Sequence, residues 1–171
     1  MTIETCPDCG FQWAVIEREE VGPRCVAAAR EISDLLREAT TAALVRPEPE
    51  RWSAVEYGAH VRDVMLTIRD RLVIGLVEDN PDFKPLYRDQ RFDWGLYADD
   101  TAVNIADEIG PAANMLHRLF EAIDPAQLDR PVQYGWPEPA TRSLLWMGAQ
   151  AVHEAEHHRD DIAENLDRSS R

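Results

Sequence analysis

Residues 51–65, RWSAVEYGAHVRDVM, mark the clearest start of a helix in the chain. Ser53 and Glu56 have the spacing of a capping box, in which each side chain accepts a hydrogen bond from the backbone N–H of the other residue. The apolar residues after the box recur at helical spacing as far as about Glu78: Tyr57, Val61, Val64, Ile68 and Leu72. His60 lies beside this apolar stripe, so its side chain can point into a helix bundle.

Three more segments have apolar residues at helical spacing. They cover residues 21–44, 102–123 and 143–166, and the second of them contains Gly110-Pro111, where a kink is expected. Together with the segment after Ser53, they make four helices of about 20 residues each, and no block of the sequence is rich in strand patterns. This organisation predicts an all-α four-helix bundle.

The connections and the N-terminus complete the predicted domain. Residues 80–100 carry prolines and aromatic residues without sustained periodicity, so they are expected to form a long loop between the second and third helices, and loops of this length are often functional. Residues 131–139 are expected to be a connection rich in proline, glycine and aromatic residues. The 171 residues fit one domain, with residues 1–20 as a short cysteine-containing extension and residues 21–171 as the bundle.

Charge and hydropathy exclude two classes of partner. The chain has 32 acidic and 18 basic residues and a net charge of −14, so its surface should repel a phosphate backbone, and nucleic acid is not expected as a partner. The start of the sequence, MTIETCPDCG, has neither the basic nor the apolar part of a signal peptide. No later run reaches the roughly 18 apolar residues of a membrane helix, so a cytoplasmic protein without membrane association is expected.

The segment AVHEAEHHRDD near the C-terminus contains the HExxH pattern of metalloproteases. His153 and His157 are four residues apart on one face of a helix, so a single metal ion can bridge them. A protease of this class takes a further downstream ligand, but Asp160 and Ala163 stand where the extended motif has glycine and histidine. Glu164 lies about two turns beyond His157 on the same helix, which is too far. A protease is therefore disfavoured, and the third ligand must come from upstream.

His60 is the candidate for this third ligand. His117 has no ligand-spaced partner and is interpreted as an ordinary histidine. His158 is rotated about 100° from His157, so it would face a different side of the helix. Glu154 occupies the general-base position of the protease motif, but the acidic residues beside it favour a solvated helix face. Only one Glu-x-x-His is present, whereas a di-iron bundle site needs two, so a dinuclear oxidase is also disfavoured.

The stretches RWSAVEYGAHVRDVM and AVHEAEHHRDDI strongly resemble the DinB-like superfamily of metal-binding four-helix bundles. That superfamily includes the YfiT-like hydrolases, the N-terminal domain of mycothiol-dependent maleylpyruvate isomerase and the bacillithiol S-transferases. Its pattern has a tryptophan and a polar cap opening the second helix, a metal-binding histidine about two turns later, and His-x-x-x-His on the last helix. The resemblance therefore places a metal on His60, His153 and His157. The leading CPDCGF and the segment LVEDNPDFKP are similar to an actinobacterial subgroup.

Three neutral imidazoles would leave a coordination position open on zinc, which is favoured over nickel or iron, and open positions are typical of catalytic sites. The resemblance implies S-transfer or isomerisation with a low-molecular-weight thiol of the mycothiol type as co-substrate. The leading hypothesis is a metal-dependent thiol S-transferase or isomerase that acts on a small molecule. A metal-dependent hydrolase and a non-catalytic metal-binding scaffold or sensor stay open, as does homodimerisation. The catalytic residues are not assigned from the sequence.

The three cysteines raise the question of a second metal site. Cys6 and Cys9 have the spacing of a zinc knuckle, and Cys25 follows 16 residues later. A structural site made of these three thiols plus one histidine or carboxylate is one interpretation, and a bare reduced knuckle or packing turn is another. The knuckle could also fold over the bundle near the histidines. Reduced thiols are expected in a cytosolic protein.

Overall fold

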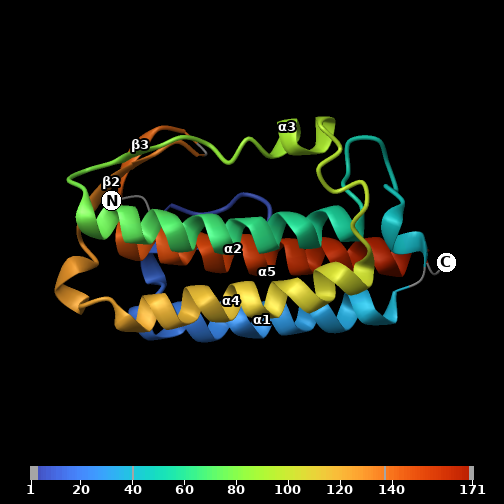
Figure 1. Cartoon of the computed structure of the whole chain (residues 1–171), viewed down its shortest axis with the longest axis horizontal. Coiled ribbons are helices and arrows are strands. Elements are labelled where there is room, and N and C mark those ends of the chain that lie inside the picture. The colour runs from blue at the N-terminus through green and yellow to red at the C-terminus, as the bar shows by residue number, and fades with distance from the viewer. Residues whose placement is uncertain (1–3, 40, 137, 170–171) are drawn as a thin grey trace.

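The computed structural model describes residues 4–39, 41–136 and 138–169. Residues 1–3, 40, 137 and 170–171, which belong to the predicted extension, first helix, connection and C-terminal end, lie outside the described residues. The fold is built on four long helices: α1 (Arg18–Glu38), α2 (Ala54–Val77), α4 (Ala102–Ala122) and α5 (Leu144–Ser169). They form the predicted four-helix bundle (Figure 1).

The order of the helices around the bundle explains the long connection after α2. Both α1 and α2 pack against α4 and α5, so the consecutive helices α1 and α2 lie diagonally across the bundle. Figure 1 shows that α2 and α4 run in the same direction, opposite to α1 and α5. The chain must therefore return along the whole of α2, whose 24 residues rise about 36 Å. Residues 78–101 make this return across the outer side of α2.

The connections contain more regular structure than the sequence pattern indicated. The return segment includes β1 (Asp82–Phe83) and the short helix α3 (Arg88–Asp93), and the connection between α4 and α5 contains β2 (Pro131–Tyr134) and β3 (Ala140–Ser143). These strands form a sheet of order β1-β2-β3, with β1 parallel and β3 antiparallel to β2. This small sheet adds to the predicted four-helix bundle, and the sequence pattern did not indicate it because strands of two to four residues are too short to show a period.

The first predicted helix is shorter than expected. α1 ends at Glu38, and Thr41–Leu44 form a separate 3-10 turn. By contrast, α4 continues through Pro111 as one helix, with Thr101 as its N-cap. The predicted apolar stripe on α2 is confirmed, since Val61, Val64, Ile68 and Leu72 are buried together with the large side chains of the other helices.

Hydropathy gives no membrane segment within the described residues. None of the helices there combines the length and the apolar composition that crossing a bilayer requires.

The predicted capping box at the start of α2 is confirmed. The Ser53 hydroxyl accepts a hydrogen bond from the Glu56 backbone N–H at 3.2 Å, and the Glu56 carboxylate accepts one from the Ser53 N–H at 2.8 Å. Ser53 is buried, so the Glu56 N–H would lose its partner in Ser53→Ala without gaining free access to water. We expect this substitution to lower the free energy of unfolding by about 1 kcal/mol, measured by urea denaturation. Ser53→Thr should keep most of the stability, and an alanine variant as stable as the wild type would contradict the capping role.

Candidate metal centre

Helix α5 carries two pairs of side chains of the types that can ligate a metal ion. His153 and His157 form one pair, Glu154 and His158 form the other, and each pair has the four-residue spacing of neighbours on one helix face. The two pairs are offset by one residue, which is a rotation of about 100° around the helix axis. They therefore face different surroundings.

Glu154 and His158 face α2, where His60 completes a cluster. The Glu154 Oε2 atom lies 3.1 Å from His60 Nε2 and 3.2 Å from His158 Nε2. All three residues are buried, and one ligand atom from each lies within 4.8 Å of the others. This set of two imidazoles and one carboxylate is named the cavity cluster below.

Two further side chains hold the cavity cluster in place. Asp161 Oδ2 lies 2.9 Å from His158 Nδ1, and because a carboxylate only accepts, Nδ1 donates and Nε2 is left facing Glu154. The Gln150 amide donates to the other oxygen of Glu154, Oε1, at 2.7 Å. The indole N–H of Trp13 donates in turn to the Gln150 carbonyl oxygen at 2.7 Å. Such partners are what orient metal ligands in proteins.

The electrostatics of the cavity cluster favour a cation beside Glu154. Burial opposes ionisation of Glu154, but hydrogen bonds from His158 and His60 hold its pKa well below the usual range. Burial likewise opposes a charged His158, yet its contacts with Asp161 and Glu154 raise the pKa of this histidine to about 9. Burial lowers the pKa of His60, which keeps that imidazole neutral. The buried, ionised carboxylate of Glu154 therefore needs a positive charge beside it, which either an imidazolium or a metal ion can supply. The two histidines and one carboxylate fit a divalent cation.

Two residues of the cavity cluster, His60 and Glu154, line a cavity. This cavity has a volume of about 330 Å³ and is lined by His60 and Glu154 together with side chains from α2, α3, the segment before α3 and the β2–β3 connection. Arg71 and Arg88 bring positive charge to it, and Trp136 and Tyr134 bring aromatic surface. The Arg71 guanidinium is stacked over the rings of Phe83 and Tyr134, which fixes its position. A small acidic molecule in this cavity would lie beside His60 and Glu154.

The structure does not bring the three predicted ligands together. His60 lies with Glu154 and His158, whereas His153 and His157 lie with Cys6 and Cys9. The prediction that Glu154 occupies a solvated face was wrong, since only 8% of this residue is exposed. His158, which the sequence placed on a different side of the helix from His157, is buried within the cavity cluster. Glu154 and His158 have the same four-residue spacing as His153 and His157, so the sequence contained both pairs. Spacing alone could not decide which pair lies beside His60.

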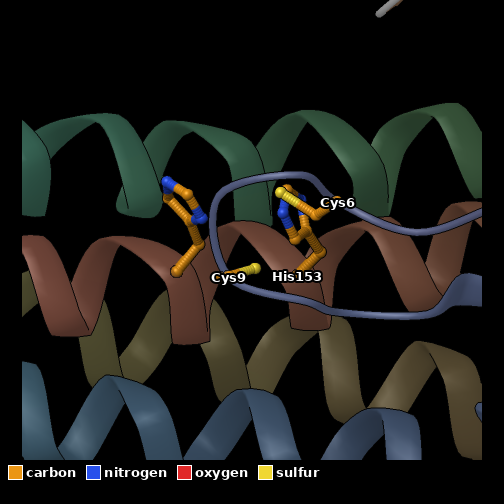
Figure 2. Close-up of side chains that lie close together, drawn as sticks. Cys6, Cys9 and His153 are labelled. Carbon is orange, nitrogen blue, oxygen red and sulfur yellow. The ribbon is translucent and has the colours of Figure 1, made fainter.

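The second cluster joins the N-terminus to α5. The Cys6 and Cys9 sulfurs and one ring nitrogen each of His153 and His157 all lie within 4.8 Å of one another. Figure 2 shows the loop with both cysteines lying over α5 beside His153. Burial and the neighbouring Cys6 raise the pKa of the Cys9 thiol to about 11. Of the interpretations left open by the sequence, the structure places the knuckle beside the two histidines.

Cys25 does not belong to this cluster. It is fully buried on α1 among core residues, and burial raises the pKa of its thiol. The predicted set of Cys6, Cys9 and Cys25 is therefore not assembled in the structure, because the knuckle faces α5. All three cysteines are free thiols in the structure, and no disulfide joins them.

Comparison with known proteins extends the likeness to most of the chain. The family model of the DinB superfamily matches residues 25–162. A solved structure of YfiT from Bacillus subtilis, described as "a probable metal-dependent hydrolase with an unusual four-helix bundle topology", is similar with a TM-score of 0.72. The two chains are 16% identical, and the match covers 91% of this chain and 90% of that one, so it shows a shared fold. Among curated proteins, none matches the sequence significantly.

Proposed function

We propose, since the chain belongs to the DinB superfamily, that it is a metal-dependent enzyme whose ion is held by His60, Glu154 and His158 and whose substrate is a small molecule. The observation that carries the proposal is the placement of these three buried ligand atoms within 4.8 Å of one another, with two of the residues lining a cavity. Three protein ligands leave a coordination position for a substrate, which is the arrangement of catalytic rather than structural zinc sites.

The roles of the surrounding residues follow from their contacts. Zinc or a similar ion in the cavity cluster would supply Lewis acidity, which keeps a thiol or a water molecule deprotonated near neutral pH. Asp161 fixes the ring of His158, and Gln150 fixes the carboxylate of Glu154. Arg71 and Arg88 are suited to hold a carboxylate or phosphate of the substrate or thiol.

The distribution of carboxylates supports a thiol S-transferase or isomerase. Hydrolysis by an activated water usually needs a free general base, whereas a thiolate is itself the nucleophile. In the cavity cluster, Glu154 lies between two histidines and Asp161 is bonded to His158. Among the described residues that line the cavity, the remaining carboxylate is Asp89, whose side chain is 71% exposed. A low-molecular-weight thiol of the mycothiol type is therefore the proposed co-substrate.

A metal-dependent hydrolase is the second candidate. The set of two histidines and one glutamate also occurs in zinc hydrolases, where three protein ligands accompany a water molecule. The description of YfiT as a probable metal-dependent hydrolase points the same way.

Activity of the zinc-loaded protein tests the proposal. The protein is incubated with mycothiol and an electrophile, and in parallel with ester and amide substrates without thiol. We expect formation of the thiol conjugate to fall at least about 100-fold in His60→Ala, because the ion loses one of its ligands. His117→Gln, on α4 and outside both clusters, should keep the wild-type rate.

The outcomes separate the candidates. Ester or amide hydrolysis that needs no thiol but depends on His60 would favour the hydrolase. If neither reaction exceeds the rate of the His60→Ala protein, the enzyme proposal is wrong and a non-catalytic metal-binding scaffold becomes the better interpretation.

A further inference from the structure

The N-terminal segment forms a small hairpin that presents two thiols to α5. Thr5 and Gln12 pair as an antiparallel bridge, and the Cys6 backbone N–H donates to the Phe11 carbonyl oxygen at 2.8 Å. The Gly10 N–H donates to the Cys6 carbonyl oxygen at 2.9 Å, and Gly10 has a φ of +75°, which glycine adopts without strain. This turn places the sulfurs of Cys6 and Cys9 on one side of the hairpin, facing His153 (Figure 2).

Among the described residues, the histidine that meets these thiols has no other polar partner. His153 is only 4% exposed, and neither of its ring nitrogens has a hydrogen-bond partner in the described part of the chain. The Nδ1 atom of His157 is also buried without a partner among those residues. An unsatisfied buried polar group destabilises the folded state, so such groups in a native protein call for a ligand. The aromatic rings of Phe11 and Trp13 lie 5.2 Å and 4.7 Å from the His153 ring and exclude water from it.

The donor set identifies the ligand as a metal ion. Two cysteine sulfurs and two imidazole nitrogens make the set that tetrahedral zinc prefers, with ligands spaced as Cys-x-x-Cys and His-x-x-x-His. Four protein ligands fill the coordination sphere, so no position stays open for a substrate. We infer that Cys6, Cys9, His153 and His157 bind a second, structural zinc ion that fastens the N-terminal hairpin to α5.

Fastening the hairpin has a consequence for the cavity cluster. Trp13 follows the hairpin directly, and its indole N–H is bonded to Gln150. Gln150 in turn donates to Glu154, which belongs to the cavity cluster. The structural zinc thus holds the segment that orients Gln150 and, through it, the carboxylate of Glu154. The two ions occupy neighbouring faces of α5 and have different tasks.

Metal content and cobalt spectra test the structural site. The full-length chain without a histidine tag is purified under reducing conditions and loaded with Zn²⁺ or with Co²⁺. We expect two ions per wild-type chain and an absorption band from thiolate-to-cobalt charge transfer. The Cys6→Ser/Cys9→Ser variant should hold one ion and lose the band. The matched control, His60→Ala, should also hold one ion but keep the band, because its lost ion has no sulfur ligand.

Thiol reactivity of the wild-type chain gives a test that needs no variant to fold. Cys9 is exposed, so a thiol reagent can reach it in the metal-free protein, and excess reagent at alkaline pH offsets the raised pKa of this thiol. Bound Zn²⁺ should slow this alkylation at least about tenfold, and a chelator should restore the rate.

Three results would overturn the inference. They are a cobalt-loaded wild type without the thiolate band, a cysteine double variant with the same number of ions as the wild type, and alkylation of Cys9 that is indifferent to zinc. None of them bears on the cavity cluster, whose proposal fails separately if His60→Ala keeps both ions.

Discussion

Glu154→Gln is expected to empty the cavity cluster of its ion while leaving the Cys6, Cys9, His153 and His157 site filled. The Oε2 atom of Glu154 is the one that approaches both His60 and His158, and it carries the only negative charge among the three ligands. The amide of glutamine is neutral and binds cations more weakly. We expect zinc affinity at the cavity cluster to fall at least about 100-fold, measured by competition with a chromophoric chelator.

His153→Gln is the matched comparison, because it changes the neighbouring residue on the same helix. This variant should keep the ion of the cavity cluster and lose the ion that gives the thiolate-to-cobalt band. The reverse pattern, in which His153→Gln empties the cavity cluster and Glu154→Gln does not, would contradict the two clusters and support the set of His60, His153 and His157 predicted from the sequence.

The fold was predictable because its strongest signals are local. The capping box at Ser53 and Glu56 involves residues three apart, and the apolar spacing of α2 extends over one helix. The long segment after α2 was predicted as a loop. It must be long because α2 and α4 run in the same direction, and no local sequence pattern contains the relative direction of two helices. The short strands were missed for the same reason, since β1 exists only through its pairing with β2.

The sites were harder to predict because they depend on helix rotation and on distant contacts. The sequence around residue 155 offers two pairs at four-residue spacing, and only the rotation of α5 decides which pair faces His60. A rotation of about 100° exchanges His153 for Glu154. Pairing of the knuckle with the histidines joins residues almost 150 positions apart in the chain, which spacing rules cannot reveal.

Acidic neighbours in the sequence were a poor sign that Glu154 is exposed. Glu154 was assigned to solvent because acidic residues stand near it, yet the structure gives that carboxylate two histidines and one glutamine as partners. Glu156, two residues on, is half-buried and faces α1, where its carboxylate accepts a hydrogen bond from Arg24 at 2.8 Å. A run of mixed acidic and histidine residues on a helix can therefore belong to several faces at once.

Removal of zinc by a chelator is expected to lower the melting temperature of the wild-type protein by about 10 °C. An ion that binds only the folded chain stabilises it by about 4 kcal/mol when present at a thousandfold excess over its dissociation constant. For a domain of this size, each kcal/mol corresponds to about 2–4 °C. The measurement is thermal unfolding followed by circular dichroism, with and without chelator.

The structural ion should account for most of this effect, because the stabilisation grows with the affinity of the site, and four ligands with two thiolates are expected to bind zinc more tightly than the three ligands of the cavity cluster. The chelator should therefore act on His60→Ala almost as on the wild type and have little effect on Cys6→Ser/Cys9→Ser, whose melting temperature is already lower. Cys25→Ala is the control for loss of a thiol. Its melting temperature should be lower than that of the wild type because the substitution leaves a cavity in the core, but the shift caused by the chelator should be unchanged. If the cysteine double variant responds to chelator like the wild type, the stabilising ion does not depend on Cys6 and Cys9. That ion would then belong to the cavity cluster instead.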